Sequence, residues 1–251
     1  MTYKLYLGDC LEIMQTIKSG SIDAIITDLP YGTTACKWDT VIPFEPMWKE
    51  AKRVLKPNGV FATTASQPFT SALIMSNIDM FKYEWIWEKP KATGHASCNS
   101  RPMKAHENIV IFGGNTYNPQ KTIGTPYKGR NKIGYPESKV FSTGQGNRND
   151  NNGFRYPRTV IKINNSYYSE KQNHPTQKPI ALYEYLIRTY TNECDTVLDI
   201  CMGSGTTIVS AIRTGRNAIG IEMDKEYFEI AKNRIEFQSQ LGNIETQKEL
   251  L

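Results

Sequence analysis

The segment Asp28-Leu-Pro-Tyr-Gly32 places a carboxylate, a proline and an aromatic ring within five residues. An exocyclic amino group on a nucleobase is a poor nucleophile because its lone pair is delocalised into the ring. The carboxylate of Asp28 and the backbone carbonyl of Leu29 or Pro30 could accept its two N–H groups, which would free the lone pair for in-line attack. Tyr31 offers a flat surface on which an extruded base could stack. The alternative is an ordinary turn after a strand.

A second segment, residues 197–207, reads as a strand, a glycine turn and the start of a helix. Gly203 and Gly205 would let the backbone approach a ligand, and the N–H groups of the first helical turn favour an anionic group. Dinucleotides and S-adenosylmethionine both meet that description. The dinucleotide fingerprint needs a third glycine three residues after Gly205, where this chain has Ile208. The segment therefore favours S-adenosylmethionine.

Acidic residues flank this glycine turn. Asp199 precedes it, and Glu222 closes the next strand, where it could accept hydrogen bonds from ribose hydroxyls, with Met223 beside the adenine face. The two acids weaken the alternative, a structural turn that binds nothing. Lys178 could reach the methionine carboxylate, although a surface lysine before a helix is the commoner role of such a residue.

The elements that must position these loops alternate along the chain. Apolar patterning predicts strands within 21–31 and at 60–65, 83–87, 108–112, 196–200 and 218–222, and helices at 44–55, 71–80, 180–190, 206–214 and 225–238. Strands alternating with helices imply parallel β-α-β units and a doubly wound sheet of the α/β class. Because such sheets bind ligands at the carboxyl ends of their strands, both loops are expected at one edge.

Residues 114–173 follow a different pattern, rich in Gly, Asn, Pro, Ser, Tyr and basic side chains, with only 160–163 resembling a strand. From Gly113 to Lys178 eleven basic residues face three acidic ones, in a chain of net charge +5. Lys and Arg neutralise phosphates, while Asn, Gln and Arg read base edges. The many aromatic residues argue against the alternative, a flexible solvated loop. Double-stranded DNA is the expected partner.

Composition excludes several other classes. The 251 residues are 39% hydrophobic and 22% charged, which fits one large globular domain or a domain with a subdomain. The five cysteines form no C-x-x-C pair, so neither a zinc knuckle nor a disulfide framework is expected, and no Pro-Cys offers a thiolate for methylation at cytosine C5. The chain lacks the apolar runs of a signal peptide or a membrane span, and a cytoplasmic location is expected.

In order and content these motifs resemble the beta class of DNA amino-methyltransferases, the adenine-N6 and cytosine-N4 family. In that family an acidic or seryl Pro-Pro-Tyr-like tetrad comes first, a target-recognition insert follows, and the S-adenosylmethionine motif lies near the C-terminus. The resemblance covers nearly the whole chain. Its remaining matches, in the family's order, lie at residues 7–14, 33–39, 56–59, 87–90, 106–109 and 174–179. The visible departure is Leu29, where proline is the commonest family residue.

The resemblance implies a Rossmann-like, mostly parallel sheet of seven strands, with a catalytic domain over 1–113 and 174–251 and a target-recognition insert over 114–173. It implies methyl transfer from S-adenosylmethionine to a flipped base, with no metal and with Asp28, Pro30 and Tyr31 as catalytic residues. It implies that Asp9 binds the adenine amino group of the cofactor. The full expected set of cofactor-binding residues is Asp9, Cys10, Asp28, Lys178, Asp199, Gly203, Gly205, Thr206, Glu222 and Met223.

The acid at Asp28 favours adenine N6, because relatives that act on cytosine N4 more often place serine there; cytosine N4 is the near alternative. An RNA or protein methyltransferase is disfavoured by the insert. A non-catalytic DNA-binding module would need none of the acids, and an NAD-linked oxidoreductase is disfavoured by Ile208. The resemblance leaves a homodimer and a cognate restriction endonuclease open as partners.

Overall fold

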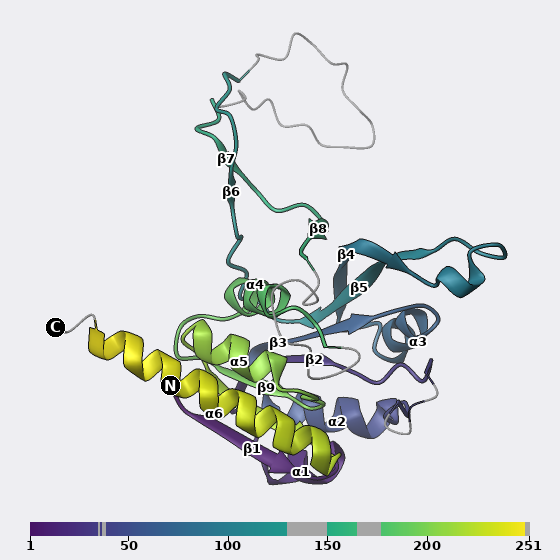
Figure 1. Cartoon of the computed structure of the whole chain (residues 1–251), viewed down its shortest axis with the longest axis vertical. Helices are drawn as coiled ribbons and strands as arrows, with labels where there is room; N and C mark the ends of the chain where they lie inside the picture. The colour runs from purple at the N-terminus through teal and green to yellow at the C-terminus, as the bar shows by residue number, and fades with distance from the viewer. Residues whose placement is uncertain (35, 37–38, 130–149, 165–176, 249–251) are drawn as a thin grey trace. The chain divides into compact units, whose positions relative to one another are not determined.

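The computed structural model describes residues 1–34, 36, 39–129, 150–164 and 177–248 (Figure 1). The chain divides into two compact units, one formed by Met1–Asn118 with Thr159–Leu251 and the other by Pro119–Arg158. Residues 130–149 and 165–173 of the predicted insert lie outside the described residues. So do residues 35, 37 and 38 of the 33–39 match and residues 174–176 of the motif that contains Lys178.

The first unit is built on an eight-stranded sheet in the order β1-β10-β9-β2-β3-β5-β4-β8. Neighbouring strands are parallel except at β5, which runs antiparallel to both β3 and β4. The strands are β1 (Tyr3–Leu7), β2 (Ile22–Asp28), β3 (Leu55–Ala65), β4 (Phe81–Thr93), β5 (Lys104–Gly113), β8 (Val160–Lys162), β9 (Thr196–Asp199) and β10 (Asn217–Glu222). The α/β class and the mostly parallel sheet are confirmed.

The expected number of seven strands is one too few. The additional strand is β8, which pairs in parallel with β4 over three residues and covers part of that strand's edge. β4 itself is longer than the predicted 83–87, because it continues beyond the apolar core as a ribbon paired with β5. β3 begins at Leu55 rather than at residue 60, since Leu55 pairs with Ile22 across a register shift.

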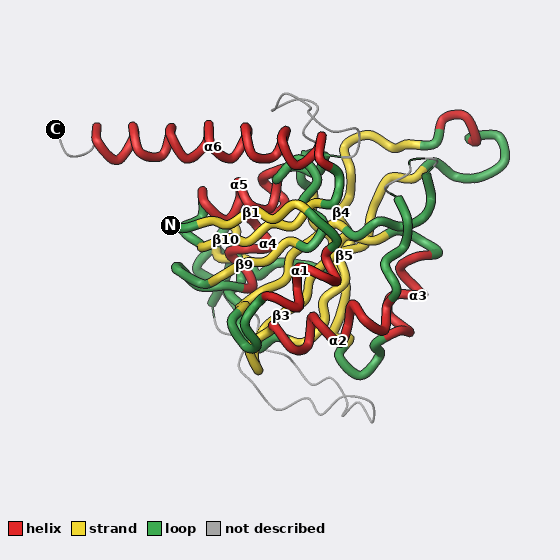
Figure 2. Tube along the Cα trace, turned by 90° about the horizontal axis from the view of Figure 1, so that it is seen from below, coloured by secondary structure: helices red, strands yellow, loops and turns green. Residues whose placement is uncertain are grey.

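Helices cover both faces of the sheet (Figure 2). One face carries α1 (Cys10–Thr16), α2 (Phe44–Val54) and α3 (Phe69–Ser76), and the other carries α4 (Ile180–Tyr190), α5 (Thr206–Arg213) and α6 (Lys225–Lys248). Successive side chains of a strand point to opposite faces. Ile25 therefore packs in the core beneath α1 and α2, while Ile26 packs in the core beneath α4 and α5. The continuous apolar run of β2 is explained by burial on both faces.

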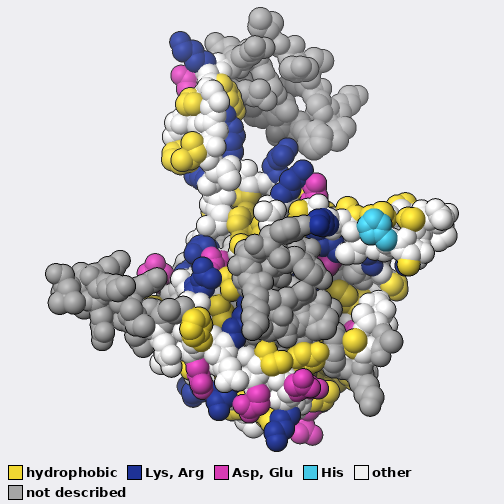
Figure 3. Space-filling model, in the orientation of Figure 1, with side chains coloured by type: hydrophobic (Ala, Val, Ile, Leu, Met, Phe, Trp, Pro, Cys, Tyr) yellow, Lys and Arg dark blue, Asp and Glu magenta, His cyan; other side chains and the backbone are white. Residues whose placement is uncertain are grey.

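The second unit contains a short antiparallel pair, β6 (Thr122–Ile123) with β7 (Phe154–Arg155), and an isolated bridge between Tyr127 and Asn151. The Arg155 guanidinium lies 4.9 Å from the centre of the Tyr127 ring, and Lys and Arg side chains lie along the described part of this unit (Figure 3). In neither unit do the described residues include a helix with the length and apolar character needed to span a bilayer.

Candidate active site

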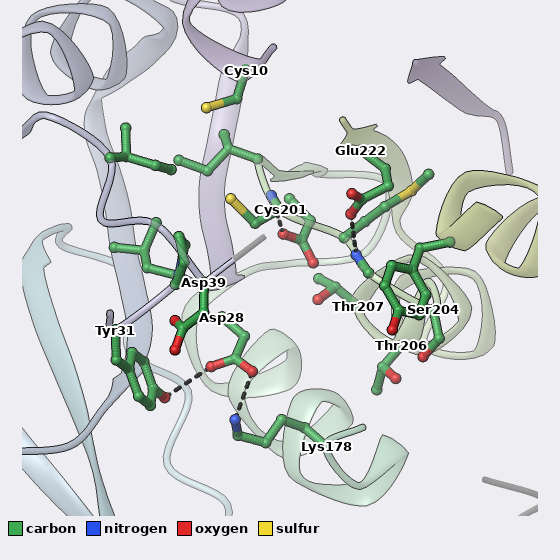
Figure 4. A pocket seen from close by; sticks show the side chains of 18 of the residues that line it. Cys10, Asp28, Tyr31, Asp39, Lys178, Cys201, Ser204, Thr206, Thr207 and Glu222 are labelled. Atoms are coloured by element: carbon green, nitrogen blue, oxygen red, sulfur yellow. Dashed lines mark hydrogen bonds and ion pairs between the residues drawn. The ribbon is translucent and has the colours of Figure 1, made fainter. Parts of the chain in front are cut away.

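The carboxyl ends of β1, β10, β9 and β2 meet at one edge of the sheet, because these four strands are parallel neighbours. A pocket of about 610 Å³ opens at this edge, a volume typical of ligand sites. It is lined by residues 28–31, which follow β2, and by residues 199–204, which follow β9. The two loops that the sequence singles out therefore share one pocket (Figure 4).

Asp28 is the last residue of β2, and its side chain is 25% exposed toward this pocket. Oδ1 accepts hydrogen bonds from the Tyr31 hydroxyl at 2.8 Å and from the Thr64 hydroxyl. Oδ2 accepts a hydrogen bond from Lys178 Nζ at 2.6 Å. The carboxylate is thus held in one orientation by side chains from three separate segments, as a substrate-positioning acceptor must be.

The rest of the tetrad also lines the pocket. Leu29, Pro30 and Tyr31 all line the pocket, and Leu29, which is 4% exposed, also packs in the core. The Tyr31 ring stacks on Phe69 with centroids 5.2 Å apart. Burial and the neighbouring Asp28 carboxylate raise the pKa of Tyr31 above its ordinary value, so its hydroxyl stays a proton donor. The departure from the family pattern at Leu29 thus places a largely buried leucine in the wall of the pocket.

Asp39 fixes the loop that follows the tetrad. Its carboxylate accepts hydrogen bonds from the backbone N–H groups of Gly32 at 2.9 Å, Thr33 at 2.9 Å and Thr34 at 2.6 Å. Burial alone would raise the pKa of Asp39, but the Thr34 hydroxyl and these N–H groups bring it below its ordinary value. Gly32 adopts φ +67°, and a Cβ there would lie 2.9 Å from Val41. The loop therefore needs both its acid and its glycine.

Glu222 ties the glycine loop to the end of β10. Its Oε2 accepts from Gly203 N and its Oε1 from Asp224 N, both at 2.8 Å. Burial raises the pKa of Glu222, and the backbone donors offset part of that rise. Met223 is 63% exposed and lines the pocket beside it. The expected contacts of Glu222 with the ribose and of Met223 with the adenine stay predictions.

The two glycines of the turn have different surroundings. Gly203 adopts φ +52° and an added Cβ would meet no heavy atom within 4 Å, so its backbone is open on the pocket side. Gly205 adopts φ +80°, and a Cβ there would lie 3.0 Å from Ile235 and 3.2 Å from Ala231 of α6. Every predicted site residue lines the pocket except Gly205, which instead allows close packing of the turn against α6.

The loop after β1 completes this side of the pocket. Asp9 caps α1, since its Oδ1 accepts from Leu11 N at 2.7 Å. Asp9 and the buried Cys10 both line the pocket. At the other flank Thr206 begins α5 and also lines it. The structure thus brings the N-terminal and C-terminal cofactor motifs together.

Asp199 is 2% exposed at the end of β9. Its Oδ1 accepts from the Thr27 hydroxyl at 2.7 Å and from Cys201 N at 3.0 Å. Burial raises its pKa to about 6, and the hydrogen bonds from Thr207, Thr27 and Cys201 limit the rise. Asp199 thus serves as a buried anchor of the glycine loop.

The raised pKa predicts a pH-dependent stability. Between about pH 4 and pH 6 the folded state binds the Asp199 proton more tightly than the unfolded state, so this group's contribution is most favourable below pH 4 and declines as pH rises through 6. A shift of about two units corresponds to a loss of about 3 kcal/mol in the free energy of unfolding. Urea denaturation at pH 4 to 7 should show that loss in the wild type relative to Asp199→Asn. Parallel profiles for the two proteins would contradict it.

Lys178 lies beside the Asp28 carboxylate. Its side chain is 11% exposed, and Nζ lies 2.6 Å from Asp28 Oδ2 and 3.4 Å from Glu107 Oε2. Burial alone would lower the pKa of Lys178, but the Asp28 and Glu107 carboxylates raise it above its ordinary value. Lys89 Nζ in turn lies 3.0 Å from Glu107 Oε1. The expected contact of Lys178 with a methionine carboxylate stays a prediction.

Sequence reasoning misses three residues of the site. Thr64 donates a hydrogen bond to Asp28, and Lys89 and Glu107 line the pocket. Residues 87–90 and 106–109 match family motifs, but the pattern alone does not place them beside Asp28. The structure does so because β5 is antiparallel to β3 and β4, so β5 begins at the edge where β4 reaches the pocket. The family matches at residues 87–90 and 106–109 are the sequence signal that could have pointed to Lys89 and Glu107.

Comparisons with known proteins agree with this geometry. The family described as DNA methylase matches residues 22–233. Among curated relatives, the type II methyltransferase M.HpaI of Haemophilus parainfluenzae is 31% identical, with 94% of this chain aligned to 75% of that protein. M1.MboII of Moraxella bovis is 28% identical over 89% of this chain and 93% of its own.

Two solved structures share the fold. The complex of M1.HpyAVI with S-adenosylmethionine superposes with a TM-score of 0.63 at 28% identity, covering 93% of this chain and 99% of that one. The cytosine-N4-specific PvuII DNA methyltransferase superposes with a TM-score of 0.65 at 20% identity, covering 97% and 92%.

Proposed function

Because the chain belongs to the DNA methylase family of N6 and N4 amino-methyltransferases, we propose that it methylates adenine N6 in double-stranded DNA. The chain is an S-adenosylmethionine-dependent DNA methyltransferase. The observation that supports the proposed chemistry is the single pocket shared by Asp28 and the glycine loop, since methyl transfer requires the donor and the target amine to meet.

The pocket suits the cofactor. Glu222 would accept hydrogen bonds from the ribose hydroxyls, the open backbone at Gly203 would admit the ligand, and Asp9 and Met223, which line the pocket, would hold the adenine. We propose these contacts together with Cys10, Asp199 and Thr206. When bound, the cofactor supplies a methyl group on a sulfonium, which needs no metal to be electrophilic.

At the other end of the pocket Asp28 would hold the amine. One N–H of the flipped base donates to the Asp28 carboxylate, and the other donates to the backbone carbonyl of Leu29 or Pro30. These two acceptors favour the tetrahedral amine whose lone pair points along the line of attack. Tyr31 and Thr64 keep the carboxylate in place through Oδ1. Tyr31 also offers its ring to the base.

The preference for adenine rests on the acid at position 28. The fold itself does not separate the two amines, because the cytosine-N4-specific PvuII enzyme shares it. Digestion of DNA to nucleosides and mass spectrometry would decide. Amplified, unmethylated bacterial DNA, RNA and protein would be incubated in parallel with the purified enzyme and isotopically labelled cofactor. We expect N6-methyladenine in DNA alone, whereas N4-methylcytosine alone, or label only in RNA or protein, would overturn the proposal.

We further propose that residues 1–113 and 174–251 form the catalytic domain and that residues 114–173 recognise the target. Support comes from the exposed basic side chains Lys121, Lys128 and Arg158, interleaved with the exposed Tyr127 and Tyr156. Lys121 Nζ lies 4.5 Å from the centre of the Tyr156 ring. Such a surface offers both phosphate neutralisation and stacking.

This role predicts a salt-dependent affinity for duplex DNA. Each phosphate contact contributes a slope of about −0.9 to log affinity against log salt, so three contacts would weaken binding by more than about tenfold between about 50 and 200 mM salt. Fluorescence anisotropy with a labelled duplex measures this slope. Lys128→Ala with Arg158→Ala should make the slope less steep by about two, whereas Lys232→Ala, an exposed lysine of α6, should not change it. A flat salt response would argue against phosphate contacts.

A further inference from the structure

Four buried or half-buried side chains form a row of alternating charge beside the pocket: Asp28, Lys178, Glu107 and Lys89. The Nζ–O distances along it are 2.6 Å, 3.4 Å and 3.0 Å. Exposed fractions are 25%, 11%, 15% and 7%, so the charges interact with little screening by water. All four residues line the pocket. The row therefore adjoins the place where the amine would bind.

The carboxylate oxygens of Asp28 and Glu107 differ in the number of hydrogen bonds that they accept. Asp28 Oδ1 already receives the Tyr31 and Thr64 hydroxyls, so an incoming N–H must approach Oδ2, where Lys178 Nζ now sits at 2.6 Å. Glu107 Oε1 is engaged by Lys89. Glu107 Oε2 is buried and accepts no well-aligned hydrogen bond from any described residue, and it lies 3.4 Å from Lys178 Nζ.

We propose that Glu107 is a positioning residue that takes the Lys178 ammonium from Asp28 when the target amine binds. The inference rests on the proposed role of Asp28 as acceptor of that amine. A charge-assisted N–H···O contact is about 2.8 Å long, so Nζ needs to approach Oε2 by only about 0.6 Å. Lys89 holds Glu107 in place through the other oxygen. Lys178 keeps a carboxylate partner in both positions, and Asp28 Oδ2 becomes available to the substrate.

Charge and burial favour this exchange over loss of the lysine to solvent. A buried ammonium without a carboxylate is strongly disfavoured. Burial alone would raise the pKa of Glu107, but the ammonium groups of Lys178 and Lys89 bring it below its ordinary value. Glu107 is therefore an anion that can accept a hydrogen bond from Lys178. If Glu107 served only to stabilise the fold, its ion pair with Lys89 would be sufficient, and its second oxygen would not need to face Lys178.

The first test compares single-turnover methyl transfer by wild type and Glu107→Gln, with enzyme in excess over amplified, unmethylated bacterial DNA and saturating labelled cofactor. The amide keeps an oxygen for Lys89 but is a weaker acceptor for Lys178, which stays on Asp28. We expect the rate to fall by about tenfold or more, with cofactor affinity by calorimetry unchanged within about twofold. Glu88→Gln is the matched control, because Glu88 is 41% exposed and pairs with the exposed Lys162. Its rate should equal that of the wild type.

The second test removes the competing cation. Glu107→Gln with Lys178→Met should transfer methyl groups faster than Glu107→Gln alone, since Asp28 Oδ2 is then open; a purely structural defect would not improve. Should Glu107→Gln fail to bind cofactor, Glu107→Asp, which keeps the charge but withdraws the oxygens from Lys178, replaces it in both tests. A wild-type rate for the Glu107 variant, or a double variant no faster, would overturn the exchange. Full activity of Asp28→Ala would instead overturn the proposed function itself.

Discussion

Replacement of Asp28 by alanine is expected to lower the rate of methyl transfer by about 10²- to 10³-fold or more. The loss follows because an acceptor preorganised for the transition state contributes on this scale in other enzymes. Asp28 is held by Tyr31, Thr64 and Lys178, and no other described carboxylate occupies the end of β2. The affinity for S-adenosylmethionine should change by less than about threefold, because the ribose and adenine ends of the pocket are untouched.

Single-turnover label transfer and calorimetry measure these two quantities. Asp23→Ala is a suitable control, since Asp23 lies on the same strand at the far end from the pocket, where it pairs with Lys56 and accepts from Thr196 N. We expect it to cost stability but to keep the rate. Wild-type turnover by the Asp28 variant would refute the role of that carboxylate.

Replacement of Glu222 by alanine should weaken the binding of S-adenosylmethionine and largely spare the rate of methyl transfer. Its two oxygens accept from Gly203 N and Asp224 N and are proposed to bind the ribose hydroxyls. Hydrogen bonds to a charged group contribute about 1.5–3 kcal/mol each, so loss of two at the ribose weakens cofactor binding by about 10²-fold or more. Once the pocket is saturated, the transfer step should recover most of its wild-type rate, because Asp28 is unaffected.

Calorimetric titration with S-adenosylmethionine tests this directly. Glu226→Ala provides the comparison, because Glu226 is an exposed acid in the first turn of α6 that does not line the pocket. Cofactor affinity within about threefold of wild type in the Glu222 variant would remove Glu222 from the binding residues.

The sequence predicts the meeting of the two loops for a simple topological reason. Asp28 and Asp199 each end a strand, and β2 and β9 are parallel neighbours, so their carboxyl ends share an edge. The apolar runs predict these strands because burial on both faces leaves little ambiguity. That rule needs only the order and type of the elements, which local patterning supplies.

The same rule fails for Glu107. It lies near the start of β5, and only the reversed direction of that strand brings its first residues to the carboxyl ends of the others. Strand direction depends on pairing across long sequence separations, which periodicity does not encode. Lys178 differs in another way, because its motif predicts a contact near the cofactor while the acid beside it is seen only in three dimensions.

The segment that forms the second unit is anchored at both of its ends within the first. Asn118 N donates to Thr189 O at 2.7 Å, and Thr159 O accepts from Ile86 N at 2.7 Å. Residues 119–158 thus depart from and return to fixed points on the scaffold that bears Asp28, so another sequence of different length could replace them without moving a catalytic atom. If these residues read DNA as proposed, the enzyme can acquire a new recognition sequence by exchanging this cassette, and its chemistry need not evolve anew.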